Sequence, residues 1–246
     1  MKAFFRYFWI QFKMDLRDRG KLLNFYLVPL MFFLVMGAVF ASISPMMKST
    51  LAASMSIFSV TMGAVMGIPA PMVKMREIGT LRAFQVNGIP GAAVIWVQAI
   101  SAFIHTFILA VVIYLVSPLA FHSQTPKSPV CYFIILALLV FTSTGMGLLI
   151  GVISKSQSVA TMFSMVIYMP SLLLSGIMFP ASMLPKLFAW LGRILPASQA
   201  MLAFNGLGYH LKTDLNVYLS AGVLAGIGLL MLALVTWRFR VVARSE

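Results

Sequence analysis

The sequence predicts an all-α membrane protein with six transmembrane helices, an N-terminal interfacial helix and a re-entrant or interfacial segment between spans five and six. Of 246 residues, 61% are hydrophobic and only 9% are charged, whereas a soluble domain is about half apolar and a quarter charged. A spanning helix takes about 20 mostly apolar residues, so the length accommodates roughly five to seven spans. We therefore expect one transmembrane domain over residues 1–246, without a separate soluble domain.

Residues 2–21 form the expected interfacial helix. One helical face carries Phe4, Phe5, Phe8, Trp9, Phe12 and Leu16, and a narrow stripe beside it carries Lys2, Arg6, Lys13 and Arg17. A helix with a broad apolar face and a basic flank is typical of segments that lie in the plane of a membrane surface. The alternative is a charged tail that only helps to orient the first span.

Six apolar runs are long enough to cross a membrane as helices. They cover approximately residues 25–43, 51–73, 92–116, 130–153, 159–179 and 217–237. Pro69 and Pro71 interrupt the second run, and because proline lacks a backbone donor we expect that helix to bend or finish there. Three glycine pairs permit close helix packing: Gly63 with Gly67, Gly147 with Gly151, and Gly222 with Gly226.

The segment between the fifth and sixth runs is apolar in patches but too interrupted for a seventh span. The interruptions are Pro180, Pro185, Lys186, Arg193 and Pro196. We expect short helices that dip into the outer leaflet or cap a cavity, with Pro185 and Pro196 near their first turns. The alternative is an ordinary surface loop, which would leave Trp190 and its apolar neighbours in water.

The basic residues predict the orientation in the membrane. When the connections are assigned alternately to the two sides, 13 Lys and Arg residues fall on the side of the termini and 5 on the other. Basic residues accumulate on the cytoplasmic side of membrane proteins, so we expect both termini in the cytoplasm of a cell inner (plasma) membrane. The net charge of +13 is then a topology signal, and no nucleic-acid partner is expected.

Few residues of the sequence suit chemistry inside the membrane. All five acidic residues lie outside the predicted spans, and His105 is the candidate for ion coupling, although such a histidine is more often a hydrogen-bonded packing residue. The lone Cys131 has no metal-ligand neighbours, and no zinc-protease, nucleophile-elbow or phosphate-loop motif occurs. We expect no catalytic residue, no metal and no cofactor on this chain, so a partner subunit would bind any ATP and Mg²⁺.

The connection at residues 74–91 is the most informative part of the sequence. Glu77 is the only acid between Asp18 and Asp214, and it lies within a basic stretch. The run Arg-Glu-Ile-Gly-Thr-Leu at 76–81, directly after the second span, closely resembles the loop of type-2 ABC exporter permeases. The run Ser-Gly-Ile-Met-Phe-Pro that ends at Pro180, the basic amphipathic N-terminal helix and the six spans are also similar to that family.

This resemblance implies a permease that works with a second permease chain, as a homodimer or heterodimer, on two ABC ATP-binding subunits. In that family the loop after the second span forms a coupling helix that sits in a groove of the ATPase. Carried over, the contact residues here would be Arg76, Glu77, Gly79 and Thr80. A charge-assisted pair could orient the helix, and glycine permits a close backbone approach. The alternative is a solvated turn with ordinary charges.

The resemblance also places spans two and five around a substrate path. Methionines in these spans are Met62, Met66, Met162, Met165 and Met169. Their flexible, polarisable side chains suit a cavity that repacks around varied apolar compounds, although ordinary membrane-facing side chains are an equally good interpretation.

The sequence thus predicts the transmembrane subunit of an ATP-driven exporter, surrounded by membrane lipid. Its substrate would be a hydrophobic or amphipathic compound such as a drug, an antibiotic, a lipid or a peptide. The alternative from another class is a non-transporting membrane sensor or immunity protein that sequesters a lipid or peptide.

Overall fold

The structure is a computed structural model that describes residues 2–43, 45–80, 84, 86, 91–178, 183–213 and 215–245. Every regular element within these residues is a helix. Six helical stretches are long and apolar enough to cross a membrane: Arg19–Ile43, Leu51–Glu77, Ala93–Phe121, Pro129–Ile153, Gln157–Leu174 and Val217–Arg238. The predicted class, an all-α membrane protein with six spans, is confirmed for the described part of the chain.

An amino-terminal helix, α1 (Lys2–Arg17), precedes the first span. Asp18 separates the two, and its carboxylate accepts hydrogen bonds from the backbone amides of Gly20 (2.9 Å) and Lys21 (3.3 Å). This cap satisfies amides that have no partner within the helix, so it starts a new helix at residue 19 rather than 25. The first span is built from α2 (Arg19–Leu22), the π-helical turn η1 (Leu23–Leu27) and α3 (Val28–Ile43).

The second span lies at the centre of the bundle. It follows the short helix α4 (Pro45–Ser49) and consists of α5 (Leu51–Thr61), the π-helical turn η2 (Met62–Met66) and α6 (Pro69–Glu77). All of α5 is buried. A turn at 67–68 interrupts the span, and Pro69 then opens α6, where its missing amide would have had no partner anyway. The helix ends at Glu77 instead of 73, so the first residues of the predicted loop form its last turn.

The remaining spans are single long helices. They are α8 (Gly91–Phe121), α9 (Pro129–Ile153), α10 (Gln157–Leu174) and α13 (Val217–Ser245). The third span ends at Phe121, beyond the predicted residue 116. Pro118 lies in its last turn, and its missing backbone donor helps to end the helix there. The fifth ends at Leu174, whereas the sequence suggests residue 179, which lies outside the described residues.

Two short helices fill the connection between the fifth and sixth spans. They are α11 (Lys186–Gly192) and α12 (Pro196–Ala203), which continues through the π-helical turn η4 (Phe204–Gly208). The two are bent by 88° relative to each other. Pro185 directly precedes α11 and Pro196 opens α12, as their positions in the sequence suggest. The connection is therefore a broken helical pair and not an irregular loop.

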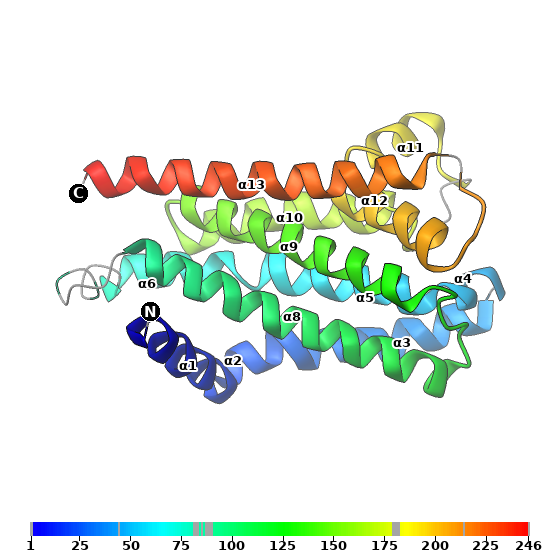
Figure 1. Cartoon of the computed structure of the whole chain (residues 1–246), viewed down its shortest axis with the longest axis horizontal. Coiled ribbons are helices and arrows are strands. Elements are labelled where there is room, and N and C mark those ends of the chain that lie inside the picture. The colour runs from blue at the N-terminus through cyan, green and yellow to red at the C-terminus, as the bar shows by residue number, and fades with distance from the viewer. Residues whose placement is uncertain are drawn as a thin grey trace.

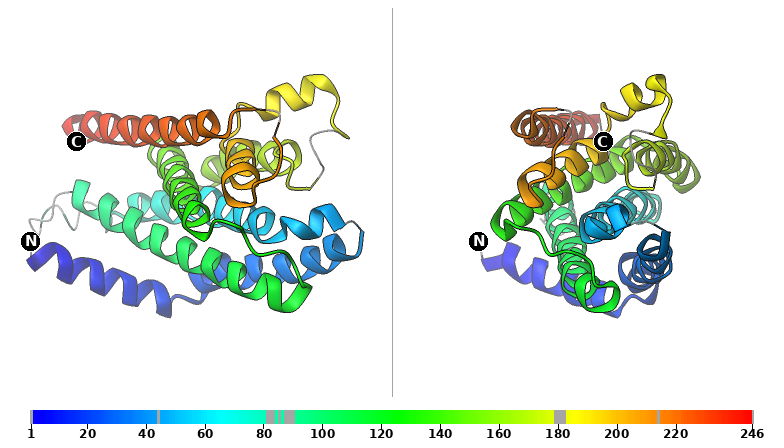
Figure 2. Two further views of the ribbon diagram at one scale, coloured as in Figure 1. Left: turned by 45° about the vertical axis from the view of Figure 1, so that its right-hand side comes forward. Right: turned by 90° about the vertical axis from the view of Figure 1, so that its right-hand side faces the viewer.

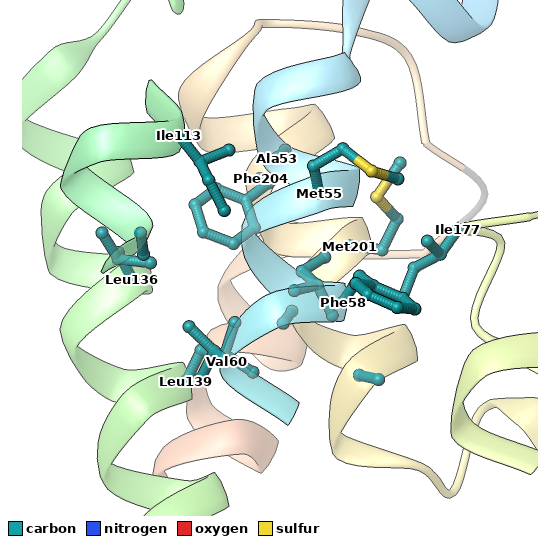
Figure 3. Close-up of a cluster of buried hydrophobic side chains, with 14 of the residues drawn as sticks. Ala53, Met55, Phe58, Val60, Ile113, Leu136, Leu139, Ile177, Met201 and Phe204 are labelled. Atoms are coloured by element: carbon teal, nitrogen blue, oxygen red, sulfur yellow. The ribbon is translucent and has the colours of Figure 1, made fainter. Parts of the chain in front are cut away.

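The spans pack into one bundle in which both termini lie near the same end (Figure 1). We call this the termini end, and the opposite end, with α4 and α11, the distal end. Helix α13 packs along α9, and α5 packs against α8; Figure 2 shows α5 surrounded by other helices. Phe58, Leu139 and Phe204 belong to one cluster of buried side chains contributed by α5, α9 and the α12–η4 stretch (Figure 3).

The glycine pairs of the sequence differ in what they contact. A Cβ atom at Gly147 would lie 2.2 Å from the carbonyl oxygen of Ala64, so α9 and η2 approach too closely for any side chain there. A Cβ atom at Gly222 or Gly226 would meet nothing within 4 Å. A Cβ atom at Gly63 would lie 3.1 Å from a side-chain carbon of Thr106. Close packing within the chain thus uses the second-span and fourth-span pairs, and the sixth-span pair faces away from the bundle.

Candidate coupling site

The four residues suggested as partner contacts lie at the termini end, where the second span ends. Helix α6 packs there against both α9 and α10. We define the coupling surface as residues 76–80 together with the turn 154–157 that joins α9 to α10. The two segments are brought together by packing of the spans, although about 80 residues separate them.

Arg76 is half-buried and binds the end of α9. Its Nη1 donates to the carbonyl of Val152 (2.9 Å), and its Nη2 donates to the carbonyls of Gly151 (3.2 Å) and Ser154. The last carbonyls of a helix have no intrahelical partner, and a cation is favourable at this negative end of the helix dipole. The side chain therefore joins the ends of the second and fourth spans, and its hydrogen-bond donors are used within the chain.

Glu77 is exposed and links α6 to α10. Its Oε2 accepts a hydrogen bond from Nε2 of Gln157 (2.7 Å), the first residue of α10. Arg76 and Glu77 thus hold three span ends together from adjacent positions, one facing inward and the other outward. The sequence does not indicate a role for Gln157, because no local pattern connects it to a residue 80 positions away.

Gly79 ends α6 with a left-handed backbone conformation, φ +72°. Its amide donates to the carbonyl of Arg76 (3.1 Å), as in a glycine C-cap. No atom would lie within 4 Å of a Cβ there, so the glycine is required by its backbone conformation. Ile78 beside it is 66% exposed. Thr80 is half-buried and helical, and residues 81–83 lie outside the described part.

The methionines of the suggested substrate path fall into two groups. Met62 and Met66 are partly buried and pack against the main hydrophobic core. Met162, Met165 and Met169 recur at helical spacing on α10 and are about half exposed. The three therefore share one outward-facing side of the fifth span, and the structure does not show the two groups lining a common cavity.

A second polar site joins α1 to α8 at the carboxylate of Asp15. This side chain is buried, although it belongs to the helix expected at the membrane surface. Ser101 Oγ donates to its Oδ2 (2.6 Å), Gln11 Nε2 donates to its Oδ1 (2.8 Å), and Lys21 forms an ion pair with it. Burying a carboxylate is costly unless such partners surround it. The site therefore fixes α1 on the third span.

His105 lies one helical turn from Ser101 and completes this contact. Its ring stacks on Phe12 of α1, with centroids 4.7 Å apart, and its Nδ1 hydrogen-bonds the hydroxyl of Tyr26 (2.6 Å). Its Nε2 has no partner among the described residues. The expectation of a hydrogen-bonded packing histidine is confirmed.

The packed side and the exposed side of α1 both carry apolar residues. Phe8 and Phe12, from the apolar face predicted for an interfacial helix, are partly buried on the same side as the polar Gln11 and Asp15. Trp9 is 60% exposed, and Ile10, Met14 and Leu16 also face outward. Apolar side chains thus occupy both sides of α1.

Tyr7 connects α1 to the segment that follows the second span. Its ring lies 5.3 Å from that of Phe84, centroid to centroid. Burial, and then the nearby negative charge of Asp15, raise the pKa of the Tyr7 hydroxyl to about 12. The phenol therefore remains neutral at physiological pH and acts as an aromatic packing group.

The described residues thus form a bundle of six apolar helices in which the ends of three spans are joined at one face. The model of the family described as ABC-2 type transporter matches residues 2–209, and the chain belongs to this family. A similar curated protein is ABC transporter G family member 20 of Dictyostelium discoideum, 26% identical over 145 residues. The match covers 57% of this chain and 20% of that protein, so it spans about a fifth of the relative's length.

Family membership confirms the resemblance seen in the sequence. The chain is a transmembrane ABC transporter subunit and a multi-pass membrane protein. ABC-2 membrane proteins work with ABC ATP-binding subunits.

Proposed function

We propose that this subunit moves a hydrophobic or amphipathic compound, such as a drug, an antibiotic, a lipid or a peptide, out of the cell. ATP and Mg²⁺ bind to a partner ABC ATP-binding subunit, and this chain binds no cofactor. A second permease chain, identical or related, completes the transporter. The assembly lies in the inner (plasma) membrane with both termini in the cytoplasm, so the coupling surface faces the partner subunit.

The observation that supports this proposal is the joining of three span ends at the coupling surface. Arg76 holds the end of α9 and Glu77 holds the start of α10, both from the last turn of the second span. A displacement of this turn by a partner would therefore move three helices together. Helical spans behave as rigid elements, so such a movement reaches the distal end and can bias the subunit between inward-open and outward-open states.

The coupling residues divide into two roles. Glu77, Ile78 and Gly79 are the exposed part of the surface and contact the ATPase, with Thr80 at its edge. Arg76 is a positioning residue, because its donors are bound to α9. The exposed Ile78 adds an apolar group that a groove on the partner can bury.

The substrate path lies along the outward-facing methionine side of α10. Met162, Met165 and Met169 face away from the subunit's own core, so a second permease chain opposite them would enclose a path lined by adaptable side chains. Met62 and Met66 lie behind this surface and can repack when the second span moves.

Co-purification with the candidate ATPase and substrate-stimulated ATP hydrolysis test the proposal. We expect Glu77→Ala to reach normal membrane levels, but with weaker ATPase association or with hydrolysis that no longer responds to amphipathic drugs or lipids. Truncating one member of a desolvated polar pair at an interface costs about 2 to 5 kcal/mol, whereas an exposed pair is worth about 0 to 1 kcal/mol. Lys74→Gln is the matched control, because Lys74 is an exposed charge on the same helix.

Gln157→Ala separates the two roles that Glu77 could have. This variant removes the hydrogen bond to α10 and leaves the carboxylate in place. Normal coupling in Gln157→Ala with lost coupling in Glu77→Ala would support direct contact with the partner. Normal transport by both variants would remove the coupling assignment.

A further inference from the structure

A cavity of about 360 Å³ lies at the distal end, away from the coupling surface and the methionine side of α10. The end of α3, the start of α5, the segment after α10 and the bent pair of α11 and α12 form its walls; Figure 1 shows these elements gathered at that end. Pockets that hold small molecules range from about 300 to 1,000 Å³, so this cavity is large enough for one ligand or part of a longer one.

The lining of the cavity is partly apolar and partly basic. Side chains such as Phe40 and Met201 give the interior an apolar wall. Two basic residues, Arg193 and Lys212, line the cavity and are exposed. None of the described residues that line it is acidic, and the neighbouring Asp214 lies outside the described residues.

Two polar groups in the wall have no partner among the described residues. These are the hydroxyl of Ser175, which is 5% exposed, and the amide oxygen of Asn205. Buried polar atoms in proteins are almost always hydrogen-bonded, so an unpartnered pair beside a cavity indicates a ligand or water that bonds to them. Ser175 belongs to a bend held by Gly176, whose φ of +82° directs the chain around the cavity.

We propose that this cavity binds one anionic amphiphile, with its acidic headgroup between Arg193 and Lys212 and its alkyl chain along Phe40 and Met201. A guanidinium binds phosphate or carboxylate oxygens bidentately, and an ammonium adds a second charge contact. The polar linkage between headgroup and chain reaches Ser175 and Asn205. This inference concerns a binding site and does not depend on the direction of transport or on the coupling surface.

Two sources could supply such a ligand: an acidic phospholipid of the bilayer or an amphiphile that the transporter carries. Both share an acidic headgroup and an apolar chain, so the same residues would bind them. Basic pockets between transmembrane helices are known places for acidic lipid headgroups. Leu187, Phe188 and Trp190 of α11 are exposed apolar side chains beside the cavity, so a lipid surface that covers them would give either ligand access.

Native mass spectrometry of the full chain, purified in neutral detergent, tests the proposal. The probes are phosphatidylglycerol, dodecyl phosphate and, as the neutral comparison, phosphatidylcholine. We expect one retained acidic ligand per chain, and a Kd about tenfold weaker in the double variant Arg193→Gln, Lys212→Gln. The control is Lys127→Gln with Lys186→Gln, which removes two exposed charges from the same end but none from the cavity wall.

The outcomes separate the sources and can overturn the proposal. Loss of phosphatidylglycerol binding in the cavity variant, with no binding of dodecyl phosphate, assigns the site to a bilayer lipid. Loss of dodecyl phosphate binding in the cavity variant, with no binding of phosphatidylglycerol, assigns the site to a carried amphiphile. Binding of both probes to the unchanged chain and loss of both in the cavity variant supports the shared chemistry. Equal retention of phosphatidylcholine, or equal losses in the cavity and control variants, would overturn the proposal. Equal thermal unfolding midpoints in the two double variants establish that both are folded.

Discussion

Asp15 is a buried carboxylate, and its surroundings explain how the chain tolerates it. Hydrogen bonds from Ser101 and Gln11 and the charge of Lys21 replace the water that burial removes. Lys21 is 18% exposed, so part of its charge remains solvated and the ion pair contributes less than a fully buried one would. The hydrogen bond to Ser101 is the part that crosses from α1 to a span.

We therefore expect Asp15→Ala to destabilise the packing of α1 on α8 by about 2 kcal/mol, because it leaves buried donors without an acceptor. Asp15→Asn should cost less, since its amide oxygen still accepts from Ser101. The unfolding midpoint in detergent and limited proteolysis after α1 measure both effects. Lys13→Ala, an exposed change on the same helix, is the control, and equal stability of Asp15→Ala and the control would refute the anchoring role.

Arg76 and Glu77 are adjacent, yet they are expected to affect different properties. Arg76→Ala leaves three carbonyls at the end of α9 without their donor, and we expect a loss of about 2 kcal/mol. Arg76→Lys should recover only part of this stability, because a single ammonium cannot contact all three carbonyls as a planar guanidinium does. Hydrogen exchange of residues 151–157 and the unfolding midpoint measure this effect. Faster exchange in Glu77→Ala than in Arg76→Ala would contradict this division of roles.

At the scale of elements, the close approach of α9 to η2 depends on one glycine. A side chain at Gly147 would collide with the backbone of Ala64, which cannot move aside as a flexible side chain can. We expect Gly147→Ala to lower stability by about 1 to 3 kcal/mol, as overpacking does in well-packed cores. The unfolding midpoint of the purified chain measures it.

Gly226→Ala is the matched change on α13. It meets nothing within the chain and removes a flexible residue from a helix, so we expect stability to rise by up to about 1 kcal/mol. The opposite signs of the two variants are the distinguishing result. A loss in Gly226→Ala that disappears on dilution to monomers would place this face against another chain.

The sequence predicts the elements well where their cause is local. Pro196 opens α12 because its missing amide suits a helix's first turn, and the long apolar runs form spans because lipid demands internal backbone hydrogen bonds. The side of α1 that packs is not predictable in this way. Lipid and neighbouring helices are equally apolar, so hydrophobic periodicity does not distinguish Phe12, which packs, from Trp9, which is exposed.

At the scale of the whole molecule, the coupling surface is only half predictable. Glu77 and Gly79 can be found from the sequence, because an isolated acid and a glycine stand directly after a span. The partner Val152 lies at the end of the fourth span and Gln157 at the start of the fifth, and only the packing of α6 against α9 and α10 brings them there. In the sequence, Arg76 counts only as one of the basic residues that predict the orientation in the membrane. The structure shows that its side chain also binds the end of α9, which its sequence neighbours do not indicate.

The orientation of the whole chain can be tested from the two ends of the bundle. Six spans place both termini at one end, and 13 of the 18 basic residues belong to that side, so we expect the termini end in the cytoplasm. With Cys131 replaced by Ala, a cysteine at Gln124 at the distal end should react with an impermeant thiol reagent in intact cells. A cysteine at Lys155, exposed in the turn between α9 and α10, should react only after the cells are opened. Labelling of Lys155→Cys but not Gln124→Cys in intact cells would invert the orientation, and it would place the coupling surface where no ATP is available.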